Sequence, residues 1–389
     1  MILFDATHTS HTAAQTGIQR VCRSLFAELK KSGDVTAICH DPYQHAWRPL
    51  NSAELGQLEY AGPPSNSRKS LWSQRQRLAG HGRRLLRMRA RTPTGTGLIC
   101  PEFFSAKVGG HLPEILAAVE GPRIAIFYDA IPLQFPELTP AATVGRFPGY
   151  LRELLQFDGV AAISETSAQI LRDYWKWLGV ANPPPVIAVP LAIDPRPALP
   201  PETVVSTPPR ILSVGTLEGR KNHRALVEAC DVLWQEGWPF ELQLIGLARP
   251  DTAAPALVKI KSLQEAGRPL LYRGVGTNAE ILAAYAQCAF TVYPSLIEGF
   301  GLPVLESVGF GKPCVCSARG ALGESSREGG CVALEVVDAG TLATAIRRLL
   351  QHPEEIARLA AAARARRLKT WAEYATELLA WTNTLPRRS

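Results

Sequence analysis

The sequence EGFGLPVLE occupies residues 298–306 and both begins and ends with a glutamate. It follows the apolar run AFTVYP, which predicts a strand, and Pro303 is typical of the first turn of a helix. The stretch therefore predicts a strand, a glycine-rich loop and a helix, with Glu298 in the loop and Glu306 in the first turn of the helix. A carboxylate among apolar residues needs a partner, so each glutamate either faces water or binds a ligand.

A second segment of the same kind lies earlier in the chain. SVGTLEGRKNHRALVEA, residues 213–229, predicts a strand, a loop that contains Gly215, and a helix with Asn222 as its N-cap. Arg220 and Lys221 come just before that helix, where unpaired N–H groups and a partial positive charge already favour anions. The segment predicts a phosphate or diphosphate site. The alternative is a surface turn with two solvated cations, and the spacing is not that of a P-loop.

Short apolar runs alternate with segments of helical period on both sides of these motifs, which is typical of βα units on parallel sheets. We predict an α/β protein with two doubly wound, Rossmann-like domains: residues 1–200, then 205–365 after a proline-rich linker, with a final helix in 366–389 that packs back toward the first domain. Thr277 and Glu280 predict a capping box. The predicted strands are residues 2–4, 35–39, 98–100, 124–128, 159–164, 186–189, 210–215, 240–246, 270–274 and 288–294.

Composition agrees with two globular domains, because the 389 residues are 46% hydrophobic and only 20% charged. The start of the chain does not read as a signal peptide, and no apolar run reaches about 18 residues. The eight cysteines form no CxxC pair, so we interpret them as reduced core residues. We therefore expect a cytoplasmic protein, with peripheral attachment to the inner face of the plasma membrane as a further hypothesis.

The net charge of +7 is concentrated in one segment, residues 68–91, which carries nine Lys or Arg and no acidic residue. Leu71, Trp72, Leu78, Leu85 and Leu86 are interleaved with these cations. The pattern suits a partly amphipathic helix on an anionic membrane, and a solvated basic loop is the alternative. We expect no nucleic-acid partner, because neither an aromatic stacking pattern nor a DNA-binding motif accompanies the charge.

The two motifs together resemble those of the retaining glycosyltransferases of family 4, which have the GT-B fold of two Rossmann-like domains facing a cleft. EGFGLPVLE and VGTLEGRKN carry the resemblance, and weaker similarity extends to TGIQRV (16–21), YDAIP (128–132) and SETSAQIL (164–171). The chain departs from the family pattern at Tyr128, where histidine is frequent, and at Thr16, where many members have a second glycine beside Gly17.

The resemblance implies a role for each matching residue. Arg220 and Lys221 would neutralise the donor diphosphate, Glu298 would hold hydroxyls of the transferred sugar, and Glu306 would bind the nucleotide ribose. From the first domain, Gly17 would approach the donor and Asp129 would lie near the reacting carbon. The implied catalytic residues are thus Arg220, Lys221, Glu298 and Asp129, and the implied donor-binding residues are Gly17, Gly215, Arg220, Lys221, Glu298, Gly299, Phe300, Gly301, Leu302 and Glu306.

The expected reaction is transfer of a hexose to a saccharide or lipid-linked acceptor during synthesis of a bacterial surface polysaccharide, such as O-antigen, capsule or exopolysaccharide. TGIQRV and YDAIP resemble the family's mannosyltransferase branch, so GDP-mannose is the first donor and a UDP-hexose the next. The resemblance implies retention of configuration, and because no D-x-D pair is present to hold a metal ion, we expect the reaction to need no metal or cofactor. The alternatives are a sugar-nucleotide epimerase or hydrolase of the same fold, or a non-catalytic saccharide-binding subunit.

Overall fold

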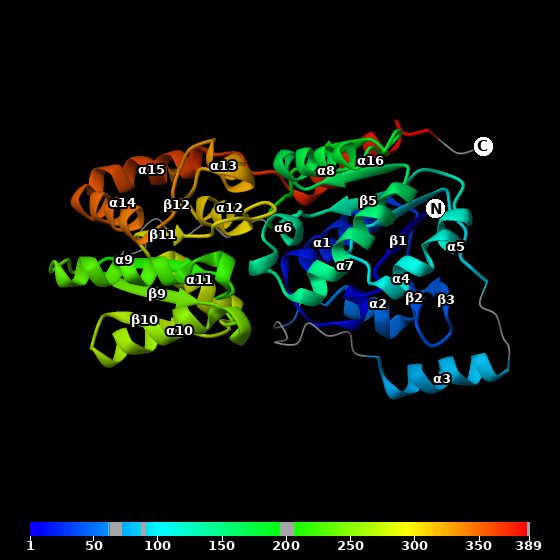
Figure 1. Ribbon diagram of the computed structural model, residues 1–389, viewed down its shortest axis with the longest axis horizontal. Helices are drawn as coiled ribbons and strands as arrows, with labels where there is room; N and C mark the ends of the chain where they lie inside the picture. Colours follow the sequence, from blue (N-terminus) through cyan, green and yellow to red (C-terminus); the bar gives the residue numbers. More distant parts are fainter. Residues whose placement is uncertain (61, 63–71, 87–90, 195–205, 387–389) are drawn as a thin grey trace. The chain divides into compact units, whose positions relative to one another are not determined.

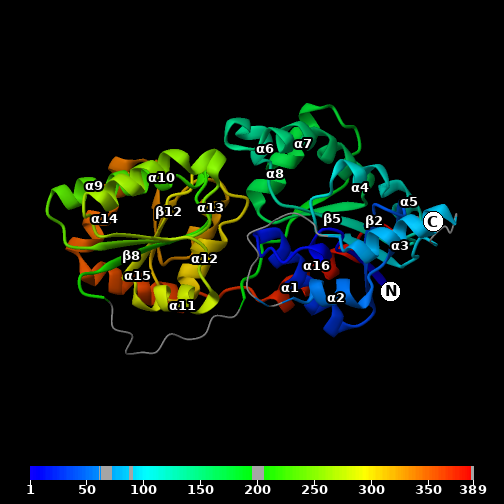
Figure 2. The ribbon, with the colours of Figure 1, turned by 90° about the horizontal axis from the view of Figure 1, so that it is seen from below.

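The structure is a computed structural model that describes residues 1–60, 62, 72–86, 91–194 and 206–386. It divides the chain into two compact units, Met1–Ala192 with Thr370–Ser389, and Ile193–Lys369. Each unit is an open sheet with helices on both faces (Figures 1 and 2). The predicted class, α/β with two Rossmann-like domains, is confirmed.

The sheet of the first unit has the strand order β3-β2-β1-β4-β5-β6-β7 in the described residues. Its pairs are parallel except β2 with β3, which is antiparallel, and β3 was not among the predicted strands. The strands are β1 (Ile2–Asp5), β2 (Val35–Asp41), β3 (Ala46–Pro49), β4 (Gly97–Cys100), β5 (Arg123–Phe127), β6 (Gly159–Ala162) and β7 (Val186–Ala188).

Helices cover both faces of this first sheet. On one face α1 packs against α16, the last helix of the chain, and the rings of Phe4 and Phe26 lie 5.4 Å apart beneath α1. On the other face α4, α5, α7 and α8 bury the larger cluster that contains Trp47, Tyr150 and Trp175. The helices are α1 (Gly17–Ser32), α2 (Ser52–Leu58), α3 (Gln74–Leu85), α4 (Ala106–Gly110), α5 (Leu112–Ala117), α6 (Ile131–Gln134), α7 (Ala141–Glu153), α8 (Glu165–Trp177) and α16 (Trp371–Thr382).

The sheet of the second unit is parallel throughout its described part, with the order β10-β9-β8-β11-β12-β13. Its strands are β8 (Arg210–Val214), β9 (Glu241–Ile245), β10 (Leu270–Arg273), β11 (Phe290–Tyr293), β12 (Cys314–Ser317) and β13 (Cys331–Leu334). Its helices are α9 (His223–Gln235), α10 (Pro250–Glu265), α11 (Asn278–Gln287), α12 (Leu302–Gly309), α13 (Gly320–Ser326), α14 (Ala339–Gln351) and α15 (Pro353–Ala365). The capping box of Thr277 and Glu280 forms at the start of α11, as predicted.

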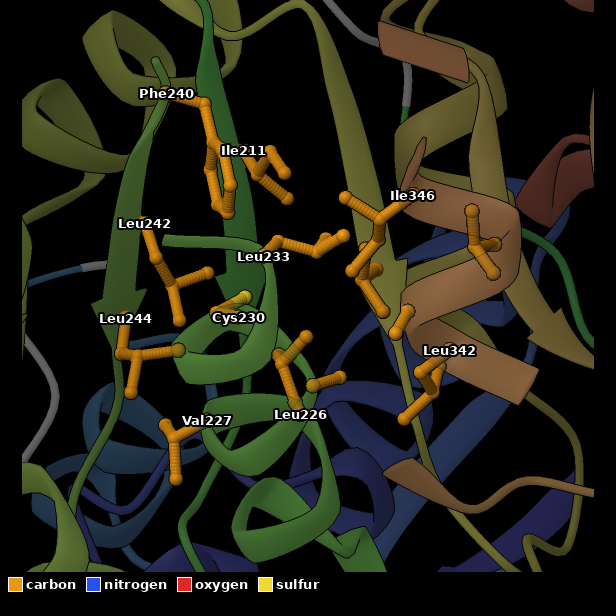
Figure 3. Close-up of a cluster of buried hydrophobic side chains, with 14 of the residues drawn as sticks. Ile211, Leu226, Val227, Cys230, Leu233, Phe240, Leu242, Leu244, Leu342 and Ile346 are labelled. Carbon is orange, nitrogen blue, oxygen red and sulfur yellow. The ribbon is translucent and has the colours of Figure 1, made fainter. Parts of the chain in front are cut away.

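The core of the second unit lies between its sheet and the helices α9, α10 and α14. Leu233 and Ile346, from α9 and α14, point toward Ile211 and Phe240 beside the sheet (Figure 3). Their apolar periodicity matches the helical repeat, so each helix presents one apolar stripe to the strands. Burial of this surface fixes β8 next to β11, and the loops that follow these two strands therefore meet at one edge of the sheet.

Candidate functional site

The loop that carries the two predicted cations follows β8. It contains a short 3₁₀ turn, Gly219–Lys221, and ends at Asn222, which adopts the left-handed conformation (φ 52°) as the N-cap of α9. The side-chain amide of Asn222 donates to the carbonyl of Val337 (2.9 Å) and forms no capping hydrogen bond to the helix. Asn222 is the N-cap residue as predicted, but it joins α9 to the loop before α14.

The loop after β11 carries Glu298 and is bonded directly to the cation loop. The backbone N–H of Leu296 donates to the carbonyl of Arg220 (2.8 Å), and the hydroxyl oxygen of Ser295 lies 3.2 Å from the same carbonyl. These bonds connect residues more than 70 positions apart because β8 and β11 are adjacent in the sheet. The two motifs therefore form one site.

Glu298 is the centre of this site. Its Oε1 accepts from Lys221 Nζ (2.5 Å), from the hydroxyl of Tyr293 (2.7 Å) and from the hydroxyl of Ser295 (2.5 Å). Its Oε2 accepts from Arg220 Nη1 (2.7 Å). Lys221 also donates to the Tyr293 hydroxyl. With four donors, the carboxylate is fixed in one orientation.

The guanidinium of Arg220 lies between two carboxylates. Nη1 contacts Glu298, Nη2 lies 2.7 Å from Oε1 of Glu218, and Arg249 lies 3.9 Å from the other oxygen of Glu218. The side chains of Glu298, Lys221 and Glu218 are each 13% exposed or less, so these ion pairs lie largely out of water. Such a cluster is stable only while the charges balance.

The charges shift one another's protonation equilibria in consistent directions. Burial alone would raise the pKa of Glu298, but the charges of Lys221 and Arg220 lower that pKa well below its usual range. Burial, with Arg220 adjacent, lowers the pKa of Lys221, although Glu298 opposes the shift. Burial and the charge of Glu298 raise the pKa of Tyr293. Glu298 is therefore an anion and Tyr293 a neutral hydrogen-bond donor at neutral pH.

The structure corrects the predicted position of Glu306. Helix α12 begins at Leu302, and Glu306 is its fifth residue, so Glu306 lies in the second turn and not in the first. Gly301 is the N-cap, with a left-handed backbone (φ 113°) that favours glycine. The hydroxyl of Ser325 on α13 donates to the carbonyl of Phe300 (2.7 Å) and fixes the loop from behind. Glu306 is 9% exposed.

Two other predicted residues, Gly17 and Asp129, lie in the first unit. Gly17 is the first residue of α1, after Thr16 as N-cap. Asp129 follows β5, and its carboxylate accepts from the N–H of Ile131 (3.0 Å) at the start of α6. The hydroxyl of Tyr128, which replaces the family's frequent histidine, donates to the carbonyl of Pro101 (2.6 Å).

Three residues of the cluster were not predicted from the sequence as site residues: Glu218, Tyr293 and Ser295. Glu218 and Ser295 lie two and three positions from residues that were singled out, so proximity in the chain was the available signal. Tyr293 was predicted only as part of a strand, because it lies in the apolar run AFTVYP. Only the pairing of β8 with β11 brings its hydroxyl to both Lys221 and Glu298.

His223, the first residue of α9, is 2% exposed, and neither of its ring nitrogens has a hydrogen-bond partner among the described residues. Burial, with the charge of Lys221 nearby, lowers the pKa of His223 to about 3. This pKa lies below the value of about 6.5 expected in the unfolded chain. The contribution of His223 to the free energy of unfolding is therefore fully present above about pH 6.5 and is lost as the pH falls toward 3. We expect a loss of about 2 kcal/mol between pH 7 and pH 5 from this residue alone.

Urea unfolding at pH 7 and pH 5 measures this loss in the wild type and in His223→Leu. Between pH 7 and pH 5, the free energy of unfolding should fall by about 2 kcal/mol less in the variant than in the wild type. The control is His352→Leu, which alters an exposed histidine paired with Glu354. Equal losses in wild type and His223→Leu would show that His223 is not buried in its neutral form.

Comparison with known proteins places the cluster within a recognised domain. Residues 197–366 match the family described as "Glycosyl transferases group 1". The match covers nearly all of the second unit, including both loops and α12. Residues 197–366 of the second unit are therefore similar to the glycosyl transferases group 1 domain.

Relatives and solved structures extend this similarity at lower identity. The chain is 24% identical to the serotype-specific mannosyltransferase WbdA of Escherichia coli over 338 residues, which cover 79% of this chain and 37% of that protein. It is 36% identical to the O-antigen chain mannosyltransferase B of Escherichia coli over 124 residues, 31% of this chain and 32% of that protein. The chain spans about a third of the length of these curated relatives.

Among solved structures, Alr3699/HepE of Anabaena, crystallised with UDP and glucose, matches with a TM-score of 0.68 at 14% identity over 99% of both chains. At this identity the likeness concerns the fold. The chain has the GT-B fold of glycosyltransferases.

Proposed function

We propose that this protein is a retaining glycosyltransferase that moves a hexose from a nucleotide-sugar to a saccharide or lipid-linked acceptor in bacterial surface polysaccharide synthesis. Two relatives are named as mannosyltransferases, one of them of the O-antigen chain, which supports mannose as the sugar and GDP-mannose as the donor. The group 1 domain supports the class of reaction.

The observation that carries the proposal is the convergence of Arg220 and Lys221 on Glu298 at the carboxyl ends of two adjacent strands. Negative charge develops on the departing diphosphate when a sugar–phosphate bond breaks, and cations held in place stabilise that charge. Because Glu298 and Glu218 already orient both cations, little reorganisation is needed when the diphosphate forms. Electrostatic preorganisation of this kind is a large part of catalysis.

In this proposal, Glu298 and Glu306 bind different parts of the donor. Oε1 of Glu298 accepts from three protein donors, so a sugar hydroxyl would meet Oε2, which accepts from Arg220. Glu306 would bind the ribose from the second turn of α12. For Gly17 and Asp129 of the first unit, the family resemblance implies roles at the donor and near the acceptor, respectively.

The reaction is expected to proceed without a metal ion and with retention of the anomeric configuration, by attack on the face from which the diphosphate leaves. The departing phosphate would accept the proton of the attacking hydroxyl. Arg220 and Lys221 would supply the positive charge that Mg²⁺ supplies elsewhere. The missing D-x-D pair motivates this expectation.

Incubation of the purified protein with GDP-mannose and a mannoside acceptor tests this function. Turnover should persist in EDTA, and the product should carry an α-linkage, the configuration of the donor, by NMR. Loss of activity in EDTA with recovery on adding Mg²⁺ or Mn²⁺ would contradict the metal-independent mechanism. Release of free mannose or of an epimerised nucleotide-sugar with no acceptor present would instead identify a hydrolase or an epimerase.

A further inference from the structure

Helix α3 lies at the edge of the first unit, below α2, β2 and β3 in Figure 1. Polar groups attach it to the rest of the unit. Gln76 donates to Glu54 (2.8 Å), and Arg83, two turns later, donates to Gln44 (3.3 Å). Gly80 lies between them, so close to Tyr43 that a Cβ on Gly80 would come within 2.4 Å of the tyrosine Cβ. Gln76, Gly80 and Arg83 therefore define the inner face of α3.

The space beneath α3 is lined by both charged and apolar residues. A cavity of about 350 Å³ opens between the helix and the ends of β2 and β3. Asp41, Arg48 and Gln76 are among the residues that line it. The charged groups in this lining are paired, because Arg48 contacts both Asp41 (2.9 Å) and Glu54 (2.7 Å).

The two leucines of α3 lie on the opposite face. Leu78 is 72% exposed and Leu85 is 85% exposed, and a separation of seven residues puts them on one side of the helix. Leu86, just beyond the helix, is 70% exposed. A soluble helix normally turns its leucines inward, so this arrangement is the reverse of the usual one.

Cations flank the exposed leucines. Arg75 and Arg77 lie on exposed positions of α3, one on each side of Leu78 by helical angle. The segment 68–91 has nine Lys or Arg and no acidic residue, whereas the chain as a whole has 42 basic and 35 acidic residues. The outer face of α3 thus combines two exposed leucines with an arginine on each side.

We propose that the outer face of α3 docks on an anionic lipid surface, with Leu78, Leu85 and Leu86 in the headgroup–acyl boundary and Arg75 and Arg77 against lipid phosphates. Apolar burial and attraction to negative headgroups reinforce each other in such helices, which lie in the plane of the interface. No helix of the described residues is long and apolar enough to cross a membrane. Docking extends the proposed function, since it would bring the enzyme to a lipid-linked acceptor, but it does not depend on that function.

Vesicle co-sedimentation of the full chain tests the docking. Binding is expected to vesicles of phosphatidylcholine mixed equally with phosphatidylglycerol, and not to vesicles of phosphatidylcholine alone. The variant Leu78→Ser/Leu85→Ser should bind the mixed vesicles at least about tenfold more weakly than the wild type, because each leucine would bury apolar surface in the lipid. Arg75→Gln/Arg77→Gln should also weaken binding and should reduce its dependence on salt.

The matched control is Val258→Ser/Lys261→Gln on α10, which removes a 71% exposed valine and an exposed cation from another helix. This control should bind as the wild type does. The proposal is overturned if the wild type binds neither vesicle, if it binds neutral vesicles equally well, or if the double serine variant binds as tightly as the wild type. Because glycosyl transfer to a soluble acceptor can be measured in the same variants, failure of docking is distinguishable from failure of the proposed function.

Discussion

The Lys221→Ala substitution is expected to lower kcat/KM for sugar transfer by about 10²-fold or more, since it removes a cation fixed where the leaving diphosphate gains charge. Arg220→Ala and Glu298→Gln should each have an effect of the same order, because the three side chains form one bonded cluster. Initial rates with saturating acceptor over a range of donor concentrations measure the effect.

A loss of stability must be separated from a loss of catalysis in this experiment. Lys221→Ala leaves a buried carboxylate with one cation fewer, whereas Lys221→Ala/Glu298→Gln removes both charges. The double variant should regain thermal stability relative to the single variant and should remain inactive. Lys261→Ala, an exposed lysine on α10, should behave as the wild type. A single variant with wild-type kcat/KM would remove Lys221 from the proposed site.

The Gly246→Ala substitution is expected to cost about 2 kcal/mol of folding free energy. A Cβ at Gly246 would lie 1.8 Å from the carbonyl oxygen of Gly215, so the loops after β8 and β9 would have to separate. The contact involves backbone, and no side chain can rotate to relieve it. For a domain of this size the apparent Tm should fall by about 4–8 °C, as measured by calorimetry.

The control for this prediction is Gly274→Ala. Gly274 follows β10 at the same edge of the sheet, and a Cβ there would meet nothing within 4 Å. Its Tm should stay close to that of the wild type. Equal Tm values for Gly246→Ala and the wild type would mean that the two loops do not approach as closely as the structure shows.

Much of the fold could be predicted because the βα alternation is local. Each predicted strand has its counterpart in the structure, and both predicted sheets are present. The missed strands β3, β12 and β13 are only four residues long, and β3 is an antiparallel edge strand. Such short runs carry too few residues for a periodicity to appear.

The chemistry of the site was less accessible to sequence reasoning. Both loops could be identified from their residue types, but the sequence could not show that Glu298 would bind Arg220 and Lys221 directly, since that contact depends on β8 pairing with β11. Glu306 was predicted in the first turn of its helix, but the helix already begins at Leu302, directly after Gly301, so Glu306 is its fifth residue. Contacts between residues that are far apart in the chain cannot be predicted from a local sequence pattern.

The central claim is that the cluster of Arg220, Lys221 and Glu298 binds the diphosphate of a nucleotide-sugar. Isothermal titration of GDP, UDP and their sugar conjugates into the wild type and into Lys221→Ala/Glu298→Gln tests it most directly, since both proteins carry a balanced cluster. The account predicts selective binding of GDP and GDP-mannose to the wild type, and affinity at least about tenfold lower in the double variant. Equal affinity in the two proteins, or no binding of any nucleotide to the wild type, would contradict it.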